Sequence, residues 1–229
     1  TRCGIAGYSK FLIEGMSLPV SIFAEKVAAS EKLTLDNPNI FRCWRANDSQ
    51  ETLAGLVSAL DGVAVDIIVV QFNFYFYDFN ALSTLISSAK HKGKKVVLVL
   101  HSTMTPPNDA SKSLVHLKPA LNICDRLIVH SIHDLNRLKS LGVVNNVALF
   151  PHGVLAAPTP HAMPESPPSS RFILASFGFC LPHKGLVELI EAVNILRIRG
   201  YSIELRMFNA LHAVPVSAEM ANTLSKHID

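Results

Sequence analysis

Short apolar runs alternate with segments of helical periodicity along most of this chain. Strands are predicted at residues 18–24, 40–44, 65–72, 95–100, 126–131 and 147–150. Helical segments separate most of them, such as residues 80–92, which Gly93 closes. Strands joined by helices form parallel βαβ units, so the pattern predicts an α/β fold with a doubly wound parallel sheet over residues 1–155. Ligands of such sheets bind beyond the carboxyl ends of the strands.

The composition narrows the class of protein. Of the 229 residues, 49% are hydrophobic and the mean hydropathy is +0.29, which the burial of parallel strands on both faces explains. No apolar run approaches the roughly 20 residues of a membrane helix, and the first residues do not resemble a signal peptide. A net charge of +3 without a basic block does not indicate nucleic-acid binding. The four cysteines are scattered and form no C-x-x-C pair, so a reducing, cytoplasmic location is expected.

Proline concentrates at one point and indicates a boundary between domains. Six of the 13 prolines lie between Pro151 and Pro168. This concentration predicts a first domain, a linker and a second domain, at residues 1–155, 156–170 and 171–229. Only two strands and two helices are predicted after the linker, too few to bury both faces of a sheet, and no strand precedes the first predicted helix. We therefore expect an internal fragment in which the second domain and the first strand are truncated.

A glycine turn followed by a lysine makes the second domain a candidate anion site. The run Phe172–Phe177 predicts a strand that ends at Gly178, and Lys184 and Gly185 then begin a helix. The N-terminus of a helix offers free N–H groups and positive potential, and the lysine adds a full charge. A phosphate-bearing ligand is therefore expected near Lys184.

Histidine and serine follow the predicted strands of the first domain. His101 could hydrogen-bond a ligand or share a proton there, or it could cap local backbone. Ser131 and His152 follow the next two strands, and Ser131 is also an ordinary N-cap candidate. His130 and His133 form an H-x-x-H pair without a third ligand at metalloprotease spacing, so no metal site is expected. We predict that His101, Ser131 and His152 lie together at the carboxyl edge of the sheet.

Two small residues, Gly4 and Gly7, lie near the amino end, where a helix is predicted to begin at Tyr8. They could form a loop that lets a ligand's phosphate approach the backbone and the helix N-terminus, or they could form a plain turn. The G-x-G-x-x-G fingerprint of nicotinamide cofactors is absent, and no cofactor is expected.

An aromatic segment, Gln71–Phe79, follows the strand predicted at 65–72. Phe74, Tyr75 and Tyr77 could stack on the sugar rings of an acceptor. The alternative is that alternate aromatic side chains pack under the next helix.

Taken in order, these motifs resemble the retaining glycosyltransferases of family 4, which have the GT-B fold. The matching segments are Cys3–Ser9, Leu100–Thr103, Ile128–Ser131, Pro151–Val154, and Ser176–Gly178 followed by Lys184 and Gly185. The resemblance implies two Rossmann-like domains, with the acceptor bound mainly by the first and the nucleotide-sugar donor mainly by the second. It implies a hexosyltransferase-type enzyme that moves a sugar to an acceptor hydroxyl with retained anomeric configuration and without an essential metal.

The resemblance also implies roles for individual residues. Two are expected to be catalytic: Lys184 would neutralise the departing diphosphate, and His101 would contact the donor sugar near the reacting carbon. Donor binding would involve Gly4, Gly178, Ser131 and His152 together with Lys184, and acceptor binding would involve Phe74, Tyr75 and Tyr77. The expected partners are a nucleotide-diphosphate sugar and a sugar or lipid-linked sugar acceptor, in glycan or cell-envelope polysaccharide synthesis. Peripheral association with the inner face of the membrane would suit a lipid-linked acceptor.

Two features depart from the family pattern. Many members carry an arginine shortly before the lysine, where this chain offers only His183, and the family's E-x7-E segment would fall beyond Asp229. A nucleotide-sugar epimerase of GT-B type and a non-catalytic sugar- or nucleotide-binding module are the alternatives. The epimerase needs catalytic carboxylates, whereas the strand ends here carry mainly histidine and serine.

Overall fold

The chain divides into two compact units, Thr1–Leu155 and Ala156–Asp229. The computed structural model describes residues 3–26, 39–46, 53–107, 109–154, 171–212 and 214–227. The predicted linker at 156–170 lies outside the described residues. No helix in the described part of the chain is long and apolar enough to cross a membrane.

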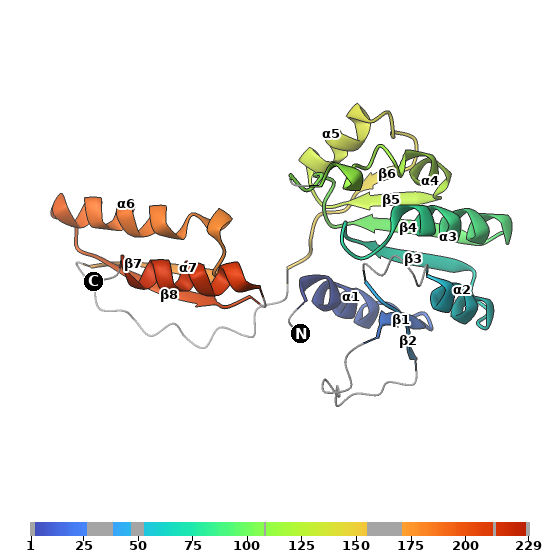
Figure 1. Cartoon of the computed structure of the whole chain (residues 1–229), viewed down its shortest axis with the longest axis horizontal. Helices are drawn as coiled ribbons and strands as arrows, with labels where there is room; N and C mark the ends of the chain where they lie inside the picture. Colours follow the sequence, from blue (N-terminus) through green and yellow to red (C-terminus); the bar gives the residue numbers. More distant parts are fainter. Residues whose placement is uncertain are drawn as a thin grey trace. The chain divides into compact units, whose positions relative to one another are not determined.

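A four-stranded parallel sheet forms the centre of the first unit. Its strands lie in the order β3-β4-β5-β6, and their bounds are Ile67–Phe72, Lys95–Leu100, Arg126–Val129 and Val147–Leu149 (Figure 1). The register pairs Phe72 with Leu100, Leu100 with Val129, and Val129 with Leu149. All four strands therefore end at one edge, which brings the segments that follow them side by side.

Helices pack on this sheet through their apolar faces. The helices of this part of the chain are α2 (Ala54–Asp61), α3 (Phe79–His91), the short η1 (Ala110–Lys112), α4 (Lys118–Ile123) and α5 (Ile132–Ser140). Asp78 caps α3 by accepting a hydrogen bond from the N–H of Ala81 at 2.9 Å. The core that these elements enclose includes fully buried side chains from both strands and helices, among them Phe72, Leu82, Ile86, Leu98, Leu100, Leu121, Leu127 and Leu138.

The sequence predicted one sheet in the first unit, but the described residues form two. Among the described residues, β1 (Ile22–Glu25) and β2 (Ile40–Trp44) pair in parallel only with each other. A side chain joins this pair to the core, because the Trp44 ring centroid lies 5.2 Å from that of Tyr77. Trp44 Nε1 also ties the two strands together by donating to the Phe23 carbonyl at 2.9 Å. Aromatic packing, which a strand pattern does not reveal, takes the place of strand pairing here.

Helix α1 (Gly4–Glu14) begins four residues before the predicted start. Gly4 and Gly7 therefore lie inside a helix, so the prediction of a loop is wrong, and the role of Gly4 in donor binding stays a prediction. Ile5, Tyr8 and Leu12 stand at helical spacing and are partly covered, which favours helix from the first turn.

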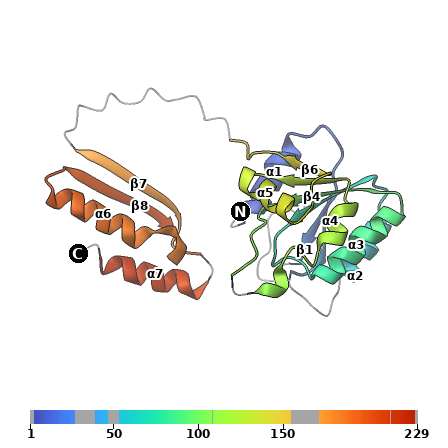
Figure 2. The same cartoon turned by 90° about the horizontal axis from the view of Figure 1, so that it is seen from above.

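The second unit is a parallel pair of strands with two helices. β7 (Phe172–Phe179) pairs with β8 (Ile203–Ala210), and α6 (Leu186–Ile198) and α7 (Pro215–Ser225) lie on the β8 side of the pair (Figure 2). Its small core includes the buried side chains Cys180, Leu186, Ile190 and Leu224. Along β7, by contrast, most side chains are exposed.

Candidate functional site

Three imidazole rings meet at the carboxyl edge of the four-stranded sheet. His101 follows β4 directly, His130 follows β5 directly, and His152 follows β6 after Phe150 and Pro151. The ring centroids are 3.9 Å apart for His130 and His152, 5.1 Å for His101 and His130, and 6.3 Å for His101 and His152. We call these three residues the histidine cluster.

Tyr8 of α1 contacts every member of the histidine cluster. Its ring centroid lies 5.0 Å from that of His101, 5.2 Å from His130 and 5.5 Å from His152, each time edge-on. Burial raises the pKa of the Tyr8 hydroxyl, which therefore stays protonated near neutral pH. The amino-terminal helix thus supplies one wall of the site.

Hydrogen bonds orient two of the three rings. His130 Nδ1 lies 2.7 Å from the Phe150 carbonyl oxygen, so Nδ1 carries the proton and Nε2 keeps its lone pair. His101 Nε2 lies 2.7 Å from Gln71 Oε1 on the neighbouring strand β3, which makes Nε2 the donor and leaves the lone pair on Nδ1. A backbone carbonyl therefore selects the tautomer of His130, and the side-chain amide of Gln71 selects that of His101.

The environments of His101 and His152 favour the neutral imidazole. Burial lowers the pKa of His101 to about 4, and the nearby His130 and His152 disfavour its charged form further. Burial, and then the neighbouring His130, also lower the pKa of His152. At neutral pH His101 is thus a neutral ring that can donate or accept a hydrogen bond, as recognition of a hydroxyl requires.

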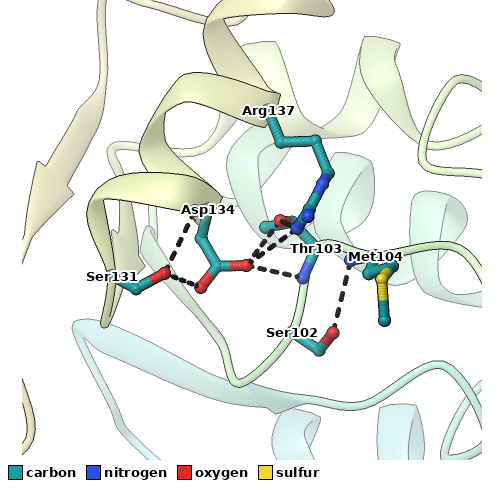
Figure 3. A network of polar contacts seen from close by, with 6 residues as sticks. All are labelled: Ser102, Thr103, Met104, Ser131, Asp134 and Arg137. Carbon is teal, nitrogen blue, oxygen red and sulfur yellow. Dashed lines mark hydrogen bonds and ion pairs between the residues drawn. The ribbon is translucent and has the colours of Figure 1, made fainter.

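A carboxylate ties the loop that carries His101 to helix α5 (Figure 3). Asp134 Oδ1 accepts from the Thr103 N–H at 3.1 Å and from the Thr103 hydroxyl at 2.6 Å, and its Oδ2 accepts from the Ser131 hydroxyl at 2.5 Å. Arg137 Nη1 donates to Thr103 Oγ1 at 2.9 Å and lies 3.4 Å from Asp134 Oδ1. This network fixes the chain just after His101.

Ser131 lies at the predicted edge, but its hydroxyl has structural partners. It accepts from the Asp134 N–H at 3.1 Å as the N-cap of α5 and donates to the same residue's carboxylate. The structure therefore accounts for Ser131 by its N-cap alternative. His133, on the first turn of α5, is exposed and does not belong to the histidine cluster. The two histidines of the H-x-x-H pair therefore do not lie in one site.

The predicted acceptor residues separate into buried and exposed positions. Phe74 and Tyr77 are 3% and 7% exposed and pack in the core, and Tyr77 donates its hydroxyl to the Gln71 carbonyl at 3.3 Å. These two side chains are not accessible for stacking on a sugar, and the packing alternative accounts for them. Tyr75, at 53% exposed, is the one of the three that a ligand can reach.

The two predicted anion-binding residues of the second unit, Lys184 and Gly178, lie in different elements. Lys184 ends the short helix η2 (Pro182–Lys184), is exposed, and stands immediately before α6, whose N-cap Gly185 forms no side-chain cap. Gly178 lies within β7, rather than after it, with a φ of +121°. Its register partner is Asn209 of β8, whose Oδ1 is buried without a hydrogen-bond partner among the described residues.

The space above Gly178 is open. A Cβ built at this position meets no atom within 4 Å, so a lack of space does not explain the glycine. Its positive φ does, because L side chains rarely adopt that conformation. Helix N-termini and lysine ammonium groups bind phosphate oxygens, so the binding of a phosphate by Lys184 and the N-terminus of α6 stays a prediction.

Comparison with known proteins identifies the family. Residues 24–150 match the glucosyltransferase-3-like family in its N-terminal domain, a segment that holds His101, His130 and the Asp134 network. The chain belongs to the glucosyltransferase-3-like family. The match supports the prediction of a glycosyltransferase domain, whereas family 4 and the retaining mechanism stay predictions. No curated protein matches the chain.

A solved structure supports the fold. The chain resembles a point mutant of S. aureus TarM in complex with fondaparinux, α-GlcNAc-glycerol and UDP, with a TM-score of 0.54 and 14% identity. The match covers 77% of this chain and 34% of TarM, so the chain spans about a third of the length of that protein. The similarity confirms the predicted GT-B-like α/β fold.

The sequence did not reveal every residue of the site. Tyr8 was expected only as the first residue of a helix, and Gln71 only as part of an aromatic segment. The available signal for Gln71 was a polar side chain near the end of an otherwise apolar strand, which needs a partner when it is partly buried. Thr103 and Arg137 have no comparable signal, because their roles depend on the approach of α5.

Proposed function

We propose that this protein is a retaining glycosyltransferase that moves a hexose from a nucleotide-diphosphate sugar to an acceptor hydroxyl. The observation that carries the proposal is the histidine cluster at the carboxyl edge of a sheet in a glucosyltransferase-3-like domain. Ligands of parallel sheets bind at this edge. A neutral imidazole there recognises hydroxyl groups without holding the diphosphate, which must leave.

Two residues take the central roles in this proposal. His101, oriented by Gln71, contacts the hydroxyls of the donor sugar near the reacting carbon. Lys184 neutralises the diphosphate as it gains charge on leaving, together with the N-terminal N–H groups of α6. His152 contributes to donor binding at the same edge as His101, and Gly178 contributes to donor binding in the second unit. Tyr75 is the remaining candidate for acceptor contact.

The Asp134 contacts favour a transferase over an epimerase. An epimerase of this architecture needs a carboxylate free to move protons, whereas both oxygens of Asp134 accept hydrogen bonds from Thr103 and Ser131. Burial alone would raise the pKa of Asp134, but the hydrogen bonds from Ser131 and Thr103 and the charge of Arg137 together lower it. This carboxylate positions the chain and does not exchange protons.

The neighbouring protein suggests the first ligands to test. The TarM mutant was crystallised with UDP and α-GlcNAc-glycerol. We propose by analogy that this protein takes a nucleotide-diphosphate sugar, with UDP-sugars as the first candidates, and a sugar or lipid-linked sugar acceptor. Its process would be the synthesis of a glycan or cell-envelope polysaccharide in the cytoplasm.

Binding measurements on Lys184 test the donor role. Calorimetry should show that Lys184→Ala weakens binding of UDP about 10-fold or more, because a charge-assisted contact to phosphate is lost, while uridine binds as before. Lys226→Ala, an exposed lysine of the same unit, is the matched control and should leave both affinities unchanged. Equal loss of uridine and UDP binding in Lys184→Ala would remove the phosphate role.

A further inference from the structure

The histidine cluster has the composition of a transition-metal site. His101, His130 and His152 each offer one ring nitrogen, and these three atoms lie within 4.8 Å of one another. The three residues come from three successive strand ends, so the rigid sheet holds their backbones in place. Sequence spacing does not reveal the set, because the three histidines are far apart along the chain.

Hydrogen bonds hold two of the rings as they hold metal-ligating histidines. Such a histidine donates its second ring N–H to a carbonyl or another acceptor, which fixes the tautomer and the orientation of the ligating nitrogen. His130 has this arrangement with the Phe150 carbonyl, and His101 has it with Gln71 Oε1. In both rings the lone pair is left on the nitrogen that makes no hydrogen bond in this arrangement.

His130 Nε2 provides a second, independent observation. The atom is buried and has no hydrogen-bond partner among the described residues. Leaving a buried polar atom without a hydrogen bond is unfavourable. A bound cation would pair this lone pair. The His152 ring is stacked on that of His130, with 3.9 Å between centroids, so it must rotate for both rings to bind one ion.

We propose that His101, His130 and His152 bind one divalent transition-metal ion of the zinc class. The donor set consists of imidazoles alone, which suits Zn²⁺, Co²⁺ or Ni²⁺ and not Mg²⁺ or Ca²⁺, whose ligands are oxygens. Tetrahedral Zn²⁺ with Zn–N bonds of about 2.0–2.1 Å places its ligands about 3.3 Å apart. His152 is exposed and lies in a loop, so its side chain can supply the small movement that closes the set.

Three protein ligands leave a fourth position open. The ion would occupy the space in which His101 is proposed to meet the donor sugar, so metal and donor exclude each other. This consequence rests on the proposed function, whereas metal binding itself does not. A metal ion bound at this site would therefore inhibit sugar transfer. It would not be an essential cofactor, and the resemblance to family 4 implies none.

Metal titration of the untagged protein tests the proposal. Isothermal calorimetry should give one Zn²⁺ per chain, and Co²⁺ should show the visible absorption of a tetrahedral complex. His130→Ala and His152→Ala should each weaken Zn²⁺ binding more than about 10-fold, and Gln71→Leu about 10-fold, as the loss of a supporting hydrogen bond does. His133→Ala is the control, because it removes the other half of the H-x-x-H pair and should leave binding unchanged.

Each outcome decides the proposal. Trp44 fluorescence and far-ultraviolet circular dichroism verify that the variants fold, and His152→Ala is the safest of them because His152 is exposed. Absence of Zn²⁺ binding in the unmodified protein, or binding unaffected by His130→Ala and His152→Ala, overturns the site. Zn²⁺ binding without inhibition of sugar transfer would leave the site intact and contradict the placement of the donor sugar.

Discussion

The carboxylate of Asp134 should contribute measurably to the stability of the first unit, with a defined pH dependence. It accepts three hydrogen bonds from Thr103 and Ser131, and its side chain is 17% exposed. A hydrogen bond to a charged group contributes about 1.5–3 kcal/mol, and partial exposure favours the lower value. Because Thr103 is 2% exposed, its N–H loses its acceptor in a buried position when residue 134 is alanine.

We therefore expect Asp134→Ala to lower the free energy of unfolding by about 3 kcal/mol at pH 7. Asp134→Asn should lower it by about 1.5 kcal/mol, because the amide oxygen still accepts from Thr103 while the charge is lost. Urea unfolding followed by fluorescence measures both, since Trp44 is the single tryptophan of the chain and is buried in the first unit. Asp61→Asn, which removes an exposed ion pair with Lys92, is the control and should cost less than about 0.5 kcal/mol.

The pH dependence follows from the direction of the pKa shift. Burial alone would raise the pKa of Asp134, but the hydrogen bonds from Ser131 and Thr103 and the charge of Arg137 lower it below its ordinary value. The stabilisation is then fully present above the unfolded-state pKa of about 3.9 and is lost as the pH falls through the lower folded-state value. The difference between wild type and Asp134→Asn should stay constant from pH 7 down to about pH 5 and shrink as the pH falls below about 4. A difference below about 0.5 kcal/mol at pH 7, or one that does not change with pH, would refute the reasoning.

Two further predictions concern the aromatic segment and the second unit. Phe74→Ala should lower the free energy of unfolding by about 3–5 kcal/mol, whereas Tyr75→Ala should change it by less than about 0.5 kcal/mol, both measured by urea unfolding; equal effects would contradict the burial of Phe74. Gly178→Ala should destabilise the second unit by about 1–3 kcal/mol, because an L side chain is strained at a φ of +121° even in open space. Hydrogen exchange of the β7 and β8 amides measures this effect, and unchanged exchange would show that the strand accommodates alanine.

Local patterns were sufficient to predict much of the fold. The strand predicted at 95–100 has those bounds in the structure, because an apolar run buried on both faces is a local signal. The parallel pairing followed from the intervening helices, and the common edge of His101 and His152 followed from the pairing. Positions along a parallel sheet can therefore be predicted without knowledge of the side-chain contacts.

Tertiary contacts account for the features that could not be predicted. Tyr77 packs against Trp44, which lies in a strand that pairs away from the main sheet, and Phe74 packs against Phe72 and Phe79. The contact of Tyr8 with the histidine cluster depends on how α1 packs. The sequence periodicity of α1 predicts only that this helix has an apolar face. Gly4 suggested a loop because glycine often marks turns, but the helical spacing of the neighbouring apolar residues prevails.

Sugar transfer by the purified protein is the most direct test of the proposed function. UDP-hexoses and a panel of sugar acceptors are incubated with wild type, His101→Ala and the control His91→Ala, an exposed histidine of α3 whose Nδ1 lies 2.8 Å from the Ser87 carbonyl. Nuclear magnetic resonance then assigns the anomeric configuration of the product. The proposal predicts an α-linked product from an α-linked donor, a loss of about 100-fold in His101→Ala and no loss in His91→Ala. An inverted product, or full activity in His101→Ala, would contradict it.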